Sequence, residues 1–152
     1  MKFSEKTQAF YANEIDYPNL PDDVIDIGDD YQELYSAINS SSHIYIQDQK
    51  VFVSDPIPDL YHTWDDTKKA WIITKEAENQ RKADQISSAE MHQQQLIDSA
   101  MSSISVIQLK TQIGRTLTDT EKQKINSVLD FIDAVSALDV SAAPDIIWPE
   151  IE

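Results

Sequence analysis

Apolar and polar residues in the second half of the chain alternate with the period of a helix. Neither Gly nor Pro occurs between Lys75 and Ile113, and apolar residues recur there at steps of three and four. This spacing predicts one long amphipathic helix. The first turns, residues 76–84, are almost wholly polar, so we expect them to face solvent or a partner. The predicted apolar stripe consists of Ile86, Ala89, Leu96, Ile97, Ala100, Ile104 and Ile107.

A second helix is predicted beyond Gly114, a residue that suits the end of the first helix. Thr118 and Glu121 have the spacing of a capping box, in which the two side chains satisfy free amides where a helix begins. The two helices predict an antiparallel helical hairpin whose thin core calls for burial against another element or a second subunit. An extended tail with Pro144 and Pro149 should follow. The stripe of the second helix consists of Ile125, Val128, Leu129, Ile132, Val135 and Leu138.

The first part of the chain instead contains short runs of β-favouring residues between Pro-containing breaks and polar turns. Residues 9–11 and 24–27 predict two short strands. Residues 31–38 predict a short helix, with an N-cap carboxylate from Asp29 or Asp30.

Two β-hairpins are predicted after this helix. One joins residues 44–46 to residues 51–53 through a short polar connection, and the other joins residues 61–64 to residues 70–74. In the second hairpin, Trp64 and Trp71 are placed to pair across the strands.

These elements predict an α+β protein with two parts. Most of the aromatic residues and four of the six prolines precede residue 73, and the composition then changes to Ala, Gln, Ser and Ile. We therefore predict a small β-rich N-terminal domain with one short helix, residues 1–72. A helical C-terminal domain with an extended tail, residues 73–152, should follow.

The charge of the chain restricts its partners. Its 152 residues include 27 acidic and 12 basic side chains, for a net charge of -15. Such a charge repels phosphate backbones and anionic lipid, so direct nucleic-acid binding is not expected. No apolar run of about 18 residues could span a bilayer, and no signal-peptide core is present at the N-terminus, so we expect a protein made in the cytoplasm without membrane insertion.

Residues with catalytic potential do not form a recognisable site in the sequence. There is no cysteine, and His43, His62 and His92 lack the spacing of metal ligands. Only two glycines occur, which leaves no Gly-rich loop for phosphate and no nucleophile elbow. Adjacent carboxylates such as Asp65 and Asp66 are typical of solvated turns. Neither catalysis nor a cofactor or metal is therefore expected.

Several stretches of the second half resemble the tail fibre assembly proteins of Mu-like and lambda-like bacteriophages and prophages. The resemblance covers roughly residues 61–152 and is weaker before residue 61. It is carried by their order along the chain: Trp64, Asp65, Ala70, Trp71 and Ile72; residues 96–101 and 104–110; residues 114–118 and 128–135; and the ending Ala-Pro-Asp-Ile-Ile-Trp-Pro at residues 143–149.

This resemblance implies a chaperone for the receptor-binding end of a trimeric tail fibre. The implied partner is the C-terminal domain of the fibre, in a trimeric complex or beside a second copy of this chain. The implied location is the bacterial cytoplasm during assembly, with retention at the fibre tip and contact with host lipopolysaccharide as further implications.

Large aromatic side chains are the candidates for partner contact, because binding energy concentrates in a few such residues. We expect Tyr11, Phe52, Trp64 and Trp71 to be the anchors, and burial in the core is the competing role for each. Two other functions stay open. One is an acidic DNA mimic that inhibits a host nuclease, and the other is a tail-tip adhesin that binds host glycan through exposed tryptophans.

Overall fold

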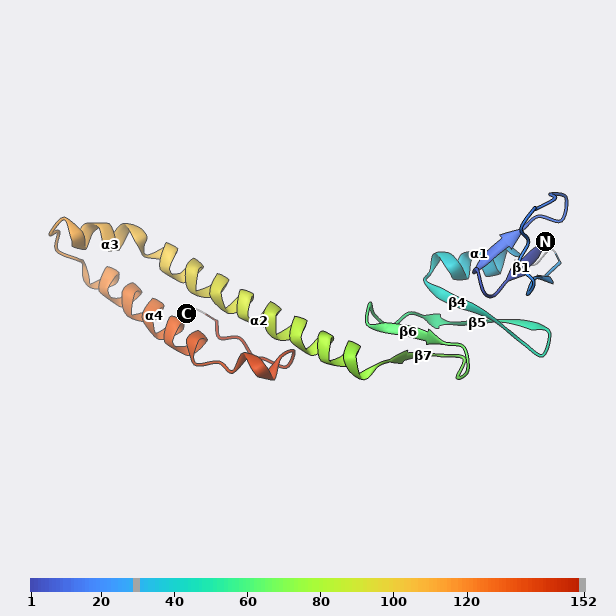
Figure 1. Ribbon diagram of the computed structural model, residues 1–152. Coiled ribbons are helices and arrows are strands. Elements are labelled where there is room, and N and C mark those ends of the chain that lie inside the picture. The colour runs from blue at the N-terminus through green and yellow to red at the C-terminus, as the bar shows by residue number, and fades with distance from the viewer. Residues whose placement is uncertain (29–30, 151–152) are drawn as a thin grey trace. The chain divides into compact units, whose positions relative to one another are not determined.

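The computed structural model describes residues 1–28 and 31–150, which form two compact units, residues 1–78 and residues 79–152. Strands occupy the first unit, and helices dominate the second (Figure 1). The mixed α/β class with strands in the N-terminal half is thus confirmed. The capping role predicted for Asp29 and Asp30 lies outside the described residues.

The first unit begins with a three-stranded antiparallel sheet in the order β2-β1-β3. The predicted strands are confirmed as β2 (Ala9–Tyr11) and β3 (Ile25–Asp26), and the sheet centres on β1 (Lys2–Ser4), which was not predicted. Phe3 and Ser4 on β1 are fully buried. This central strand escapes prediction because only Phe3 of its three residues favours β structure.

Helix α1 (Tyr31–Asn39) and the hairpin of β4 (Ser42–Gln47) and β5 (Lys50–Pro56) come next, and both predictions are confirmed. The turn between the strands contains Asp48 and Gln49, both with positive φ, as a tight hairpin turn requires. α1 packs against β4 and β5. Ile44 at the middle of β4 is fully buried.

The second predicted hairpin is confirmed as β6 (His62–Asp65) and β7 (Ala70–Ile73). Trp64 lies directly opposite Trp71, and their ring centroids are 5.4 Å apart in a T-shaped arrangement with an interplanar angle of 76°. Side chains at directly opposed positions of an antiparallel pair share one face of the sheet. The predicted cross-strand tryptophan pair is therefore present.

The prediction of one uninterrupted helix up to Ile113 is wrong. The chain forms α2 (Lys75–Ser103) and α3 (Ser105–Gln112), with an interruption at Ile104, whose φ and ψ are −110° and 6°. The Ser103 hydroxyl donates to the Ala100 carbonyl at 2.7 Å, and the Ile104 amide bonds to Met101 in a tighter turn. Serine side chains compete in this way for the carbonyls of a helix, which favours a local break.

Helix α4 (Asp119–Ser136) begins with the predicted capping box, which is confirmed: the Thr118 hydroxyl accepts from the Glu121 amide, and the Glu121 carboxylate accepts from the Thr118 amide. Gly114 just beyond α3 has a φ of +74°, as expected for a residue that ends a helix. α4 lies beside α2 and α3 (Figure 1). The chain then forms η1 (Val140–Ala142).

The core of the second unit is aliphatic. Buried residues from α2, α3, α4 and the break at Ile104 meet there, namely Ala100, Ile104, Ile107 and Val128. Gln93 on α2 donates to the Val135 carbonyl of α4 at 2.8 Å. Leu129, which was predicted to belong to the apolar stripe, is 47% exposed. The side chains of Val106, Leu109 and Ile113 are more exposed still.

In the C-terminal segment, the ring of Trp148 contacts the ring of His92 on α2, with centroids 4.6 Å apart. No helix in the described residues combines the length and the apolar character needed to cross a membrane.

Candidate partner-binding surface

Five ring side chains of the two hairpins form one aromatic cluster in the first unit. We call the aromatic cluster His43, Tyr45, Phe52, Trp64 and Trp71. His43 stacks on Trp64 with centroids 4.3 Å apart, and Tyr45 stacks on Phe52 at 5.5 Å. Tyr45 also contacts Trp64 at 5.4 Å, which joins the two hairpins through their side chains.

Three of the four predicted anchors therefore lie together, and the fourth does not. Within the described residues, no ring contact connects Tyr11 to the aromatic cluster; it packs edge-on against Tyr17 at 5.1 Å instead. Its hydroxyl also lies 3.0 Å from the Thr7 hydroxyl. Tyr11 is thus placed at a different part of the unit from Phe52, Trp64 and Trp71.

The members of the aromatic cluster differ in what they can offer to a partner. Phe52 is 41% exposed, whereas Trp64 and Trp71 are half-buried. The Trp71 indole donates to the Asp55 carbonyl at 2.8 Å, so this ring is already fixed to β5. The Trp64 indole nitrogen is buried and has no hydrogen-bond partner among the described residues.

His43 and Tyr45 were missed as members of this surface. Tyr45 faces Phe52 across the hairpin, and the alternation of the two strands could have placed it there. His43 has no comparable signal, because it lies at an irregularity in the register between Ser42 and Ile44.

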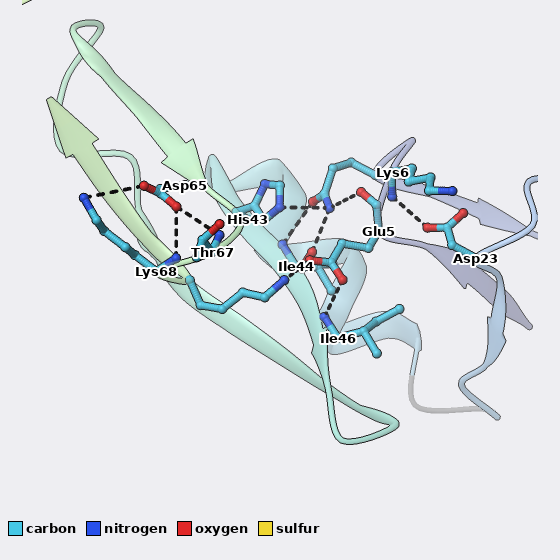
Figure 2. A network of polar contacts seen from close by, with 11 residues as sticks. Glu5, Lys6, Asp23, His43, Ile44, Ile46, Asp65, Thr67 and Lys68 are labelled. Atoms are coloured by element: carbon cyan, nitrogen blue, oxygen red, sulfur yellow. Dashed lines mark hydrogen bonds and ion pairs between the residues drawn. The ribbon is translucent and has the colours of Figure 1, made fainter. Parts of the chain in front are cut away.

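A polar network fixes the position of β4 beside the aromatic cluster (Figure 2). The Glu5 carboxylate accepts from the Ile46 amide at 2.9 Å and forms an ion pair with the Lys69 ammonium at 2.6 Å. Glu5 follows β1, Ile46 lies on β4, and Lys69 precedes β7. One carboxylate therefore connects three separate parts of the first unit.

Gln8 makes a second connection to the same strand. Its side-chain oxygen accepts from the Ile44 amide at 3.0 Å, and its side-chain nitrogen donates to the Ile44 carbonyl at 2.7 Å. The backbone of Gln8 has a φ of 49° in the turn after β1. The amide side chain thus pairs with β4 as a neighbouring strand would.

The same region brings together groups that can bind a metal ion. Glu5, His43 and Asp66 each offer one ligand atom, and these atoms lie within 4.8 Å of one another. Burial lowers the pKa of His43, with Lys69 acting in the same direction, and Asp66 and Glu5 oppose this shift. Glu5, one of the three groups, already forms an ion pair with the Lys69 ammonium. The three residues are too far apart in the sequence for a ligand-spacing motif to reveal them.

The adjoining pocket has a mixed lining of charged, polar and aromatic side chains, which include Lys6, Asp23 and Trp64. The Asp23 carboxylate accepts from the Lys6 amide and the Ser4 hydroxyl, each at 2.8 Å. Burial opposes the ionisation of Asp23, but these hydrogen bonds together hold its pKa below the usual value. Its carboxylate therefore serves to fix the turn after β1.

A protein-family model matches almost the whole chain. Residues 2–152 match the family model described as Caudovirales tail fibre assembly protein, lambda gpK. No solved structure matches.

Similar proteins occur in Escherichia coli. The prophage tail fiber assembly protein homolog TfaE of strain K12 is 52% identical over 91 residues, which cover 60% of this chain and 43% of TfaE. A tail fiber assembly protein homolog is 47% identical over 90 residues, covering 59% of this chain and 42% of the relative. The uncharacterized protein YfdK of strain K12 is 30% identical over 155 residues, covering 97% of this chain and 92% of YfdK. The chain thus spans less than half the length of the two assembly protein homologues.

Proposed function

This chain belongs to the family of Caudovirales tail fibre assembly proteins, and we propose that it is a non-enzymatic chaperone that binds the C-terminal region of a tail fibre. The observation that carries the assembly role is the family match over residues 2–152. The aromatic cluster of the first unit is the contact surface in this proposal. Phe52 is its principal anchor because it combines a large ring with an exposed face.

The physical task of such a chaperone follows from the architecture of a trimeric fibre. Three fibre chains must bring their ends into register, and until they do, strand edges and apolar surface are open to aggregation. A protein bound to these ends shields them and favours the trimeric arrangement. A binding surface that is held rigid before contact loses less conformational entropy on association. The bonds of Glu5 and Gln8 to β4 hold the aromatic cluster in this way.

The family match over residues 2–152 favours this role over an acidic DNA mimic, because it links the chain to tail fibre assembly. The geometry of the tryptophans bears on the other alternative. A glycan-binding adhesin needs an accessible tryptophan face. Trp64 is stacked on His43, and both tryptophans of the first unit are half-buried.

The proposal is tested by co-expression with the C-terminal region of a cognate tail fibre. We expect soluble fibre trimer, measured by size-exclusion chromatography with light scattering, only when the chain is present. Phe52→Ala should weaken the complex by about tenfold, a typical loss for an aromatic anchor at an interface. Leu60→Ala is the matched control, because Leu60 is 81% exposed in the same unit and lies outside the aromatic cluster.

Two outcomes would contradict the proposal. Equal yields of fibre trimer with and without the chain would remove the chaperone role. Equal losses of fibre affinity for Phe52→Ala and Leu60→Ala would contradict the aromatic cluster as the contact surface and leave the assembly role in place.

A further inference from the structure

The two edges of the β4–β5 hairpin differ in the hydrogen bonds that they make with the rest of the first unit. On β4, three backbone groups that point away from β5 are occupied by side chains. Gln8 bonds to both the amide and the carbonyl of Ile44, and Glu5 accepts from the amide of Ile46. Figure 2 shows these bonds at Ile44 and Ile46. The outer edge of β4 is therefore closed to another strand.

The register of the hairpin identifies the corresponding groups on β5. Ile44 is opposite Val53, and Ile46 is opposite Val51. In an antiparallel pair, two opposed residues either bond to each other or both point outward. Since the backbone groups of Ile44 and Ile46 point away from β5, the amides and carbonyls of Val51 and Val53 point away from β4.

These outward groups form an open edge. Within the described residues, neither Val51 nor Val53 has a hydrogen bond on this side, and the Val53 side chain is 44% exposed. The next outward carbonyl, that of Asp55, accepts from the Trp71 indole. The open edge thus runs from the turn at Gln49 to Ser54, where the aromatic cluster closes it.

We propose that this open edge of β5 binds an extended strand of the tail fibre C-terminal region by β-augmentation. This inference rests on the proposed function and specifies its mode of binding. Alternating outward amides and carbonyls are satisfied by a second extended backbone and by few other ligands. The edge accommodates a strand of about five residues at the usual rise of about 3.3 Å per residue.

The side chains along β5 define the chemistry of the strand that fits. Val51 and Val53 lie on one face of the hairpin, and Phe52 lies on the other face with Tyr45. Alternate residues of an added strand would contact the valines and the Phe52 ring in turn. No carboxylate occurs from Gln49 to Ser54, but Asp48 and Asp55 border this segment and the chain has a net charge of -15, so an apolar strand with neutral or basic flanks fits best.

Amide hydrogen exchange, followed by NMR on the labelled chain, tests this inference residue by residue. In the free chain, the Val51 and Val53 amides should exchange quickly, and the Phe52 amide, which points toward β4, should exchange slowly. In the complex with the co-expressed fibre region, exchange at Val51 and Val53 should slow by more than tenfold, with little change at Phe52. Phe52 therefore serves as an internal control within the same strand.

A pair of variants at one position separates the backbone from the side chain. Val53→Pro removes the outward amide without breaking a bond of the hairpin, because that amide makes no bond to β4. Val53→Thr retains the amide and the β-branched shape. We expect at least tenfold weaker fibre binding for Val53→Pro and less than threefold for Val53→Thr, with unchanged urea midpoints confirming that both variants fold.

Each contrary result has a distinct meaning. A stable fibre complex without added protection at Val51 and Val53 would overturn strand addition and leave the proposed function standing. Protection of these amides in the free chain that rises with its concentration would identify a second copy as the occupant and overturn the fibre strand. A confirmed cognate fibre that forms no complex at all would overturn both proposals.

Discussion

The two units of this protein maintain their structures through different kinds of contact. In residues 1–78, side chains bond to groups far away in the sequence: Gln8 reaches the backbone of Ile44, and Lys69 reaches the carboxylate of Glu5, 36 and 64 positions away. In residues 79–152, the bond from Gln93 to the Val135 carbonyl is also long-range, but it accompanies an aliphatic core and short-range bonds such as that between Thr118 and Glu121, three positions apart. The first unit therefore depends on a few specific polar partners, and the second on apolar volume and helix capping.

This difference has an energetic origin. Small sheets with two or three strands bury little apolar area, so polar bonds between them have a larger share in their order. Helices with a regular apolar stripe obtain most of their stability from packing. The comparison leads to three tests, ordered by the size of the expected effect.

The largest effect is expected in the aliphatic core. Ile104→Ala should lower the free energy of unfolding by about 2–4 kcal/mol, because it removes methylene groups and leaves a cavity. Ile104 is 2% exposed and contributes to the core despite the helix break at its own position. The measurement is urea unfolding followed by circular dichroism at 222 nm. Val106→Ala is the control at a residue that is 67% exposed, and a loss of equal size there would show that the second unit is not organised around Ile104.

A smaller but more selective effect is expected for Gln8→Ala. The variant removes the bonds to both backbone groups of Ile44, and we expect a loss of about 1–3 kcal/mol, the usual range for polar groups left without partners. Near-ultraviolet circular dichroism of the aromatic cluster should report the change, and the helical signal should be retained. Gln47→Ala is the control, since Gln47 is exposed at the end of β4. Identical spectra for the two variants would argue against the network as the support of the aromatic cluster.

The smallest effect is expected from the titration of Glu121 in the second unit. The hydrogen bond from the Lys110 ammonium, followed by that from the Thr118 amide, lowers the pKa of Glu121 from 4.5 to about 2. A carboxyl with a lowered pKa contributes stability that is complete above its unfolded pKa and is lost as the pH falls through the folded value. The contribution of Glu121 should therefore be present above about pH 4.5 and disappear toward pH 2.

Glu121→Gln isolates this contribution, because glutamine at the same position preserves the capping box. The difference between the urea midpoints of the two proteins should narrow as the pH is lowered from 5 to 2. Parallel curves over this range would show that the bond to Lys110 makes no difference to folding.

The features that were predicted correctly all have a local signature. The capping box at Thr118 and Glu121 needs four consecutive residues, and the tryptophan pair needs one hairpin. The hairpin of β4 and β5 is similarly indicated by two short β-favouring runs around a polar turn. In each case, the interaction that stabilises the structure lies within the segment from which it was predicted.

The features that were missed depend on contacts between distant segments or on small local energies. Nothing in the sequence near Glu5 indicates that it pairs with Lys69, and nothing near His43 indicates that it stacks on Trp64. The break at Ile104 is instead a local effect of small energy. The bond from the Ser103 hydroxyl to one helix carbonyl outweighs the regular apolar pattern. Residue type alone also could not show that Phe52 joins the aromatic cluster whereas Tyr11 packs against Tyr17.

The buried indole nitrogen of Trp64 also has an optical consequence. An indole whose N–H group meets neither water nor an acceptor emits at shorter wavelength than one that is hydrogen-bonded in a polar environment, and Trp64 is in the first of these conditions within the described part of the chain. Trp71, only 5.4 Å away, has its N–H group bonded to Asp55. The two neighbouring indoles thus lie in different environments. A binding partner that rearranged the aromatic cluster would change the tryptophan fluorescence of the first unit without any added label.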